Sequence, residues 1–259
     1  MNWYRMKTVL IFLFLAINIF LAAMLGLEGR SKSRAARERI DAAIKALEPG
    51  GVTVACEVPH KTHRLGTLTL ENLRADPADF SAKILGGTAA RFGNEWRRNG
   101  KTVTIYAEGF SYESGAEAVN ADKKSIKTMK ETLETMGFSM AYAEGAVTDN
   151  TVQFVQTVHG VPLFGCVLAV CPAADGTVAR MEGNWANIVE SDAERATIGG
   201  AESALLSFLR ESGGANTITE VSCGYGVLFA EEAYHSADAV PVWMVKTADG
   251  KCVFYDARQ

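Results

Sequence analysis

Histidine and cysteine side chains are the first candidates for chemistry in this chain, which contains four histidines and five cysteines. His60 and His63 lie three positions apart in PHKTH, and such a pair can offer two imidazoles to a metal ion. The segment follows an expected strand and Pro59 instead of lying in a helix, and it lacks the glutamate of an HExxH motif. We favour two solvated loop histidines, with a metal-dependent surface hydrolase at this pair as a rival hypothesis.

A second candidate is a nucleophilic pair of His159 and Cys166, which requires that the two expected strands bring them together. Free cysteines in strands rich in valine and leucine are usually buried. The cysteines form no CxxC pair, and their odd number argues against a complete disulfide framework. The chain also contains no GxSxG elbow and no phosphate-binding GxxxxGK[ST] loop. We predict that the protein is not an enzyme and holds no cofactor or metal.

The charge of the chain argues against nucleic acid as a partner. The formal net charge is −4, and the 26 lysine and arginine residues do not offset the 30 acidic ones. Nucleic-acid binding needs a basic patch or stripe, and the basic residues after position 40 are scattered. We therefore predict no nucleic-acid partner.

The N-terminal segment from Thr8 to Leu27 is almost entirely apolar. Its length is enough for a helix that crosses a hydrocarbon core, and it lacks a good A-x-A cleavage site. We expect an uncleaved single transmembrane helix. Basic residues lie on both sides, so charge alone leaves its orientation open.

One amide, Asn18, interrupts this apolar segment. A polar residue within a membrane helix often contacts a neighbouring helix, so Phe14, Asn18 and Leu21 are our candidates for a partner contact. The alternative is that a strongly apolar anchor tolerates one asparagine.

Hydrophobic periodicity divides the rest of the chain into helices and strands. Apolar residues at helical spacing predict helices in the segments SKSRAARERIDAAIKAL, KKSIKTMKETLETMGF and ESALLSFLRESGG. The last two are each followed by strand-like segments with an Asp-Gly turn, Asp175-Gly176 and Asp249-Gly250. We predict an N-terminal tail and transmembrane helix (1–29), a stalk helix with a first α/β subdomain (30–118), and two helix-plus-meander modules (119–190 and 191–259).

The expected fold class is therefore α+β, with the transmembrane helix followed by repeated helix-plus-antiparallel-sheet modules like those of PepSY and cystatin domains. Four aromatic residues near the C-terminus either line a groove for a peptide or glycan or fill the core of the last module: Tyr225, Trp243, Phe254 and Tyr255. We favour the core, because aromatic side chains dominate core packing.

The two ends of the chain resemble the YycI (WalI) family. At the N-terminus the resemblance rests on Trp3, Lys7, Thr8, Asn18, Ile19, Phe20 and Leu21. At the C-terminus it rests on Gly224-Tyr225, Pro241-Val242-Trp243, Gly250 and Phe254-Tyr255-Asp256-Ala257. The segments GVTVACEVP, Lys83 to Gly87 and Gly109 to Ser114 are similar too, so the resemblance covers nearly the whole chain.

The resemblance implies a non-catalytic, single-pass membrane protein of Gram-positive bacteria with its C-terminal part outside the cell. Its fold would be similar to the C-terminal part of YycH. With a YycH-like partner it would bind a sensor histidine kinase of the YycG/WalK type and modulate the control of cell-wall metabolism. Either a homodimer or a heterodimer is compatible with this. The alternative is a PepSY-like inhibitor or chaperone module for a secreted peptidase.

Overall fold

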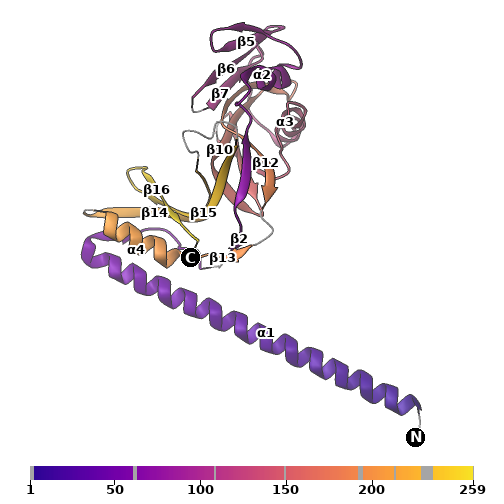
Figure 1. The fold of residues 1–259 in the computed structure, drawn as a ribbon, viewed down its shortest axis with the longest axis vertical. Helices are drawn as coiled ribbons and strands as arrows, with labels where there is room; N and C mark the ends of the chain where they lie inside the picture. The colour runs from indigo at the N-terminus through magenta and orange to yellow at the C-terminus, as the bar shows by residue number, and fades with distance from the viewer. Residues whose placement is uncertain are drawn as a thin grey trace. The chain divides into compact units, whose positions relative to one another are not determined.

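The computed structural model describes residues 3–60, 63–107, 109–148, 150–191, 195–212, 214–228 and 236–258. Its helices are α1 (Trp3–Leu47), α2 (Pro77–Leu85), α3 (Lys123–Thr135), α4 (Ala201–Glu211) and the short 3-10 helix η1 (Glu48–Gly50) (Figure 1). Its strands are β1 (Val52–Val54), β2 (Arg64–Leu65), β3 (Leu68–Asn72), β4 (Ala90–Phe92), β5 (Glu95–Arg98), β6 (Lys101–Tyr106), β7 (Gly109–Glu113), β8 (Ala143–Thr148), β9 (Thr151–Val158), β10 (Val161–Pro172), β11 (Val178–Gly183), β12 (Ala186–Ser191), β13 (Ala196–Thr197), β14 (Asn216–Leu228), β15 (Ser236–Thr247) and β16 (Cys252–Asp256).

The chain divides into two compact units, each made of segments that are distant in sequence. Unit 1 comprises residues 1–63, 199–222 and 245–253, and unit 2 comprises residues 64–198, 223–244 and 254–259. The strands β14, β15 and β16 each contribute residues to both units.

Unit 1 is built around the contact between α1 and α4. The buried residues of α1 recur every three or four positions, as a helix with one apolar stripe requires: Ala36, Ile40, Ala43 and Leu47. Those of α4 are Ala201, Ala204, Leu205 and Phe208. After η1 the chain forms β1, which pairs in parallel with the start of β14. The predicted helix from residue 31 to 47 and its end before Pro49 are confirmed.

The predicted transmembrane helix is not supported. A helix that spans a membrane needs about 20 consecutive apolar residues. α1 is continuous over Trp3–Leu47, but no helix in the described part of the chain is both long enough and apolar enough to cross a membrane.

The predicted series of separate antiparallel modules is also wrong. Apart from β13, which pairs with β2, the strands that follow α3 and those that follow α4 belong to one mixed sheet. Its main path runs in the order β12-β3-β15-β14-β10-β11-β7-β6-β5-β4, with β9 beside β10, β8 beside β9 and β16 beside β15. β10 pairs in parallel with β14 at Leu163 and Tyr225, and β3 lies between β12 and β15. An alternation of apolar and polar residues predicts that a segment is a strand, but it does not say which strand is its neighbour.

In unit 2, α2 and α3 cover one face of the sheet. α2 contacts β5 and β6, whereas α3 contacts β10 and β11. The inward side chains of neighbouring strands form one row across the sheet: Val152, Val170, Met181, Tyr112, Val103 and Trp96. All six are buried, and they belong to the same core as Met129 and Leu133 of α3. The opposite face is mostly polar, as expected for an antiparallel sheet with one solvated side.

Candidate functional site

The predicted contact residues Phe14, Asn18 and Leu21 lie on α1, in a segment whose apolar side chains are exposed. We call residues 11–24 the apolar segment of α1. Nine large apolar side chains within it are at least 48% exposed: Ile11, Leu13, Phe14, Leu15, Ile17, Ile19, Phe20, Leu21 and Met24. Exposed apolar surface of this extent is typical of an interaction site.

One N–H of the Asn18 amide is paired within its own helix. Its Nδ2 donates a hydrogen bond of 2.9 Å to the main-chain oxygen of Phe14, one turn earlier. This bond lowers the cost of an amide in apolar surroundings, because the amide N–H no longer lacks an acceptor. The amide oxygen has no hydrogen-bond partner among the described residues and can accept one from a neighbouring helix.

The aromatic residues near the C-terminus separate into core and groove. Tyr225 and Trp243 are 0% and 1% exposed and belong to the core. Tyr255 is half-buried. Burial raises the pKa of Tyr225, and its hydroxyl has no hydrogen-bond partner among the described residues. Tyr225 and Trp243 therefore lie among the buried residues of the structure.

The fourth aromatic residue, Phe254, lines an apolar groove. The groove has a volume of about 470 Å³ and lies over four strands of unit 2. Its lining residues are Phe164 and Gly165 of β10, Gly226 and Val227 of β14, Val240 and Val242 of β15, and Phe254 and Asp256 of β16. The rings of Phe164 and Phe254 meet with centroids 5.4 Å apart. We refer to this hollow as the apolar groove.

Sequence reasoning missed the groove residues Phe164, Val240 and Val242. A signal was present in the spacing, because side chains of a strand alternate between two faces. Val242 precedes Trp243, and Phe254 precedes Tyr255, so Trp243 and Tyr255 each have a neighbour on the other face of the strand. The pairing of β10 with β14, which adds Phe164, was not accessible from spacing.

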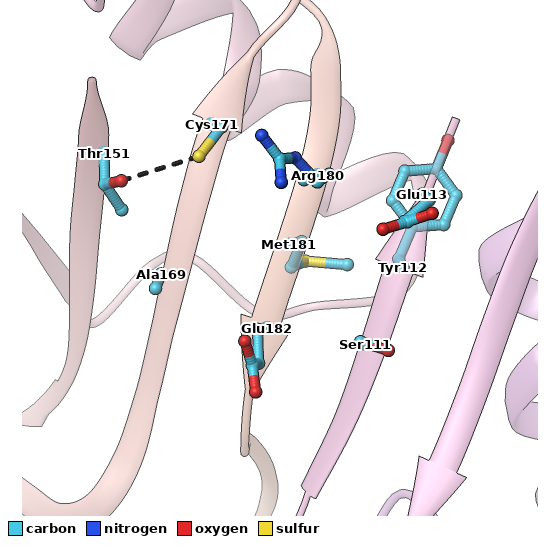
Figure 2. A pocket seen from close by; sticks show the side chains of 9 residues that line it. All are labelled: Ser111, Tyr112, Glu113, Thr151, Ala169, Cys171, Arg180, Met181 and Glu182. Carbon is cyan, nitrogen blue, oxygen red and sulfur yellow. Dashed lines mark hydrogen bonds between the residues drawn. The ribbon is translucent and has the colours of Figure 1, made fainter. Parts of the chain in front are cut away.

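A second hollow, of about 250 Å³, lies on the polar face of the unit 2 sheet. Figure 2 shows Arg180 on β11 with Cys171 of β10 on one side and Glu113 of β7 on the other, and the strand register makes these residues direct neighbours. The Thr151 hydroxyl lies 3.5 Å from Cys171 Sγ. Glu182 accepts a hydrogen bond of 3.0 Å from Tyr106.

No hydrogen bond between a nucleophile and a base is found among the described residues that line the polar hollow. Arg180 takes part in none of the ion pairs of the described residues, and the Cys171 thiol lies within hydrogen-bond distance of the Thr151 hydroxyl. Polar side chains such as those that line this hollow are also what the solvated face of an antiparallel sheet requires. We therefore assign no function to it.

The histidine and cysteine candidates do not converge. His60 Nε2 lies 3.2 Å from the Arg37 guanidinium, and no group of three or more His, Cys, Asp or Glu side chains in the described residues is placed to hold a metal. His159 lies 3.0 Å from the guanidinium of Arg195, and burial together with this cation lowers the pKa of His159. His235 lies outside the described residues.

Cys166 is buried, and no hydrogen bond links it to His159 among the described residues. Burial raises the pKa of the Cys166 thiol to about 12. A nucleophilic cysteine is a thiolate, which needs a lowered pKa and some exposure. The environment of Cys166 is the opposite of the one that a Cys-His pair requires.

Comparisons with known proteins leave the family open. No family model matches this chain, and no curated protein matches it. Nine chains of solved structures match, among them an uncharacterized protein from Eubacterium rectale. That protein is 11% identical, with a TM-score of 0.47, and the match covers 81% of this chain and 89% of the other. This similarity carries no functional argument, and the resemblance to YycI stays a prediction.

Proposed function

We propose that this protein is a non-catalytic regulator that binds a sensor histidine kinase of the YycG/WalK type, acting with a YycH-like partner in the control of cell-wall metabolism. The kinase and the partner protein come from the resemblance to the YycI family. The observation that carries the proposal is the apolar segment of α1, with nine large apolar side chains exposed. A helix that is apolar all round is normally covered by other structure.

The candidate contact face on this helix is formed by Phe14, Asn18 and Leu21, which lie within about 60° of one another at the helical rotation of roughly 100° per residue. The amide oxygen of Asn18, which has no partner among the described residues, supports a contact with a partner helix. It lies between the apolar side chains of Phe14 and Leu21 and can accept a hydrogen bond from that helix. One hydrogen bond contributes about 1 kcal/mol net. The apolar contacts therefore provide most of the affinity, and Asn18 selects the orientation.

Regulation follows if the contact differs between two states of the kinase. A binding partner shifts a conformational equilibrium only by the ratio of its affinities for the two states. To raise the population of one state from about 1% to about 99%, the partner must bind that state about 10⁴-fold more tightly than the other. The proposal therefore predicts that kinase variants locked in opposite signalling states bind the protein with unequal affinity.

Photocrosslinking in the full-length protein tests the proposal. A photoreactive residue at Ile17, next to the contact face, is activated in cells, and the attached proteins are identified. Recovery of a sensor histidine kinase or a YycH-like protein is the expected result. Recovery of a secreted peptidase alone would instead support the inhibitor alternative, and the kinase proposal would then be wrong.

A matched pair of variants locates the contact. The double change Phe14→Ala and Leu21→Ala should lower the yield of crosslinked kinase, because it removes the apolar part of the contact face. The control is Ile19→Ala with Phe20→Ala, which removes equally exposed side chains from the other side of the helix. Equal losses in both pairs would show that no particular face binds the kinase.

Localisation at the cell membrane, with the C-terminal part outside, is a separate prediction from the resemblance. Fractionation of cells that produce the full-length protein tests the first part. Digestion of intact cells with an added protease tests the second. Protein found in the membrane fraction but resistant to protease until the cells are lysed would contradict the predicted sidedness.

A further inference from the structure

Among the described residues, the edge of β16 that faces away from β15 pairs with no other strand. The main-chain N–H of Ala257 donates to the oxygen of Pro241 over 2.9 Å. This bond fixes the register of the two strands in unit 2 and places Tyr255 opposite Trp243. Since main-chain groups alternate between the two edges of a strand, those of Phe254 and Asp256 point away from β15. Among the described strands, β16 pairs with β15 alone.

The apolar groove lies beside this edge. Phe254 contributes its main-chain groups to the edge and its ring, 49% exposed, to the wall of the groove. Val240 and Val242, both buried to 5% exposure or less, line the groove farther from the edge. A strand added to β16 would thus carry its side chains, at alternate positions, toward an apolar hollow.

The charges beside the groove neutralise each other. Asp256 forms an ion pair of 2.6 Å with Arg258, and its carboxylate accepts two further bonds from the same guanidinium, of 3.0 and 3.1 Å. The groove therefore presents no unpaired charge from its lining residues, and an uncharged apolar side chain complements it best. Its volume of about 470 Å³ is within the range of roughly 300–1,000 Å³ for ligand sites.

We propose that the free edge of β16 and the apolar groove together bind an extended peptide segment of a partner protein. The segment pairs with the main chain of Phe254 and Asp256 as an added strand, and it places an apolar side chain, aromatic or branched, in the groove. Main-chain pairing gives affinity in this mode, and the side-chain hollow gives specificity. A free fatty acid would fill the groove but could not pair with the strand edge.

Peptide binding to the full-length protein tests the proposal. The probe is a short fluorescent peptide in which threonines alternate with valines around a central phenylalanine, with a lysine at each end for solubility. Binding is followed by fluorescence anisotropy. Two further versions of the peptide carry N-methyl groups on alternate residues, one version for each edge of the peptide strand. Only the version that is methylated on the edge facing β16 should lose binding.

Two variants at one position separate the groove from the edge. Phe254→Ser removes the ring but keeps the main-chain N–H, and we expect about tenfold weaker binding from the lost apolar contact. Phe254→Pro removes the N–H as well, and binding should weaken by about fivefold more, the value of one hydrogen bond. Proline is tolerated here because this N–H does not pair with β15. Phe92→Ser, at an exposed phenylalanine of β4, is the control and should bind like the unchanged protein.

Each alternative occupant gives a different result. Equal binding by all three variants, or by both methylated peptides, would overturn the proposal. Displacement of the peptide by decanoate, with Phe254→Pro binding no more weakly than Phe254→Ser, would assign the groove to a lipid tail instead. A dimer that Phe254→Ser converts to monomer, measured by light scattering, would assign the edge to a second copy of this chain. The test does not involve α1 or a kinase, so the two proposals can fail independently.

Discussion

The reactivity of Cys166 distinguishes a buried structural thiol from the nucleophile that a Cys-His pair would need. Cys166 is 1% exposed, and burial raises its pKa from the ordinary 9.0 to about 12. At about pH 8, a thiol with the ordinary pKa is about one-tenth thiolate, and one with a pKa of 12 is about one ten-thousandth thiolate. The reactive fraction of Cys166 is therefore about a thousandfold smaller than that of an ordinary thiol.

Alkylation with iodoacetamide, followed over time by peptide mass spectrometry, measures this difference. The exposed Cys252 is the internal reference. We expect Cys166 to react far more slowly than Cys252 in the folded protein, since the thiolate is the reacting species and Cys166 is buried. Cys223, whose pKa burial also raises to about 12, should behave in the same way.

Denaturant provides the control, because all five cysteines should react at similar rates once the chain is unfolded. Alkylation of Cys166 within about tenfold of the rate of Cys252 in the folded protein would refute the argument from burial. If His159→Ala then slowed that reaction, a Cys-His pair would have to be reconsidered.

Three further predictions concern stability, measured by urea unfolding. Leu133→Ala should lower the free energy of unfolding by about 2–5 kcal/mol, because it leaves a cavity under α3, whereas the exposed Glu134→Ala should change it little. Gln156→Leu should lower it by about 1–3 kcal/mol, because the buried amide exchanges two hydrogen bonds with the main chain of β12. Asp122→Ala should destabilise α3 at neutral pH. The Ser125 N–H and hydroxyl lower the pKa of Asp122 below the ordinary 3.8, so this penalty should shrink as the pH falls through the lowered value.

Besides the helix over residues 31–47, local signals predicted two helices and two turns of this fold correctly. α3 and α4 were expected from apolar residues at helical spacing, and their buried residues, such as Met129 and Phe208, are on the expected faces. Both Asp-Gly turns join neighbouring strands, β10 with β11 and β15 with β16. In each turn the aspartate accepts the main-chain N–H two residues later. These features depend on residues close in sequence, which is why periodicity and turn chemistry found them.

α2 was not predicted, although its signals are present. Asp76 caps its N-terminus by accepting the N–H groups of Ala78 and Asp79, Pro77 occupies the first position, and Gly86 ends it with a φ of 71°. An N-cap aspartate before proline and a glycine after the last turn are sufficient to propose a helix. The positions of β3 and β14 in the sheet are different, because they depend on pairing between segments far apart in sequence.

The end of β16 shows how far a sequence can locate a binding surface. Phe254 and Tyr255 are adjacent aromatic residues of similar size, and composition alone gives no reason to treat them differently. A strand sends them to opposite faces, so when Tyr255 lies behind the sheet with Trp243, Phe254 must lie in front of it. Whether the front is solvent or a groove depends on Phe164, which the parallel pairing of β10 and β14 brings to the same face. Strand alternation therefore assigns Phe254 to the front only once the structure gives the face of Tyr255, and the sheet topology decides what surrounds Phe254.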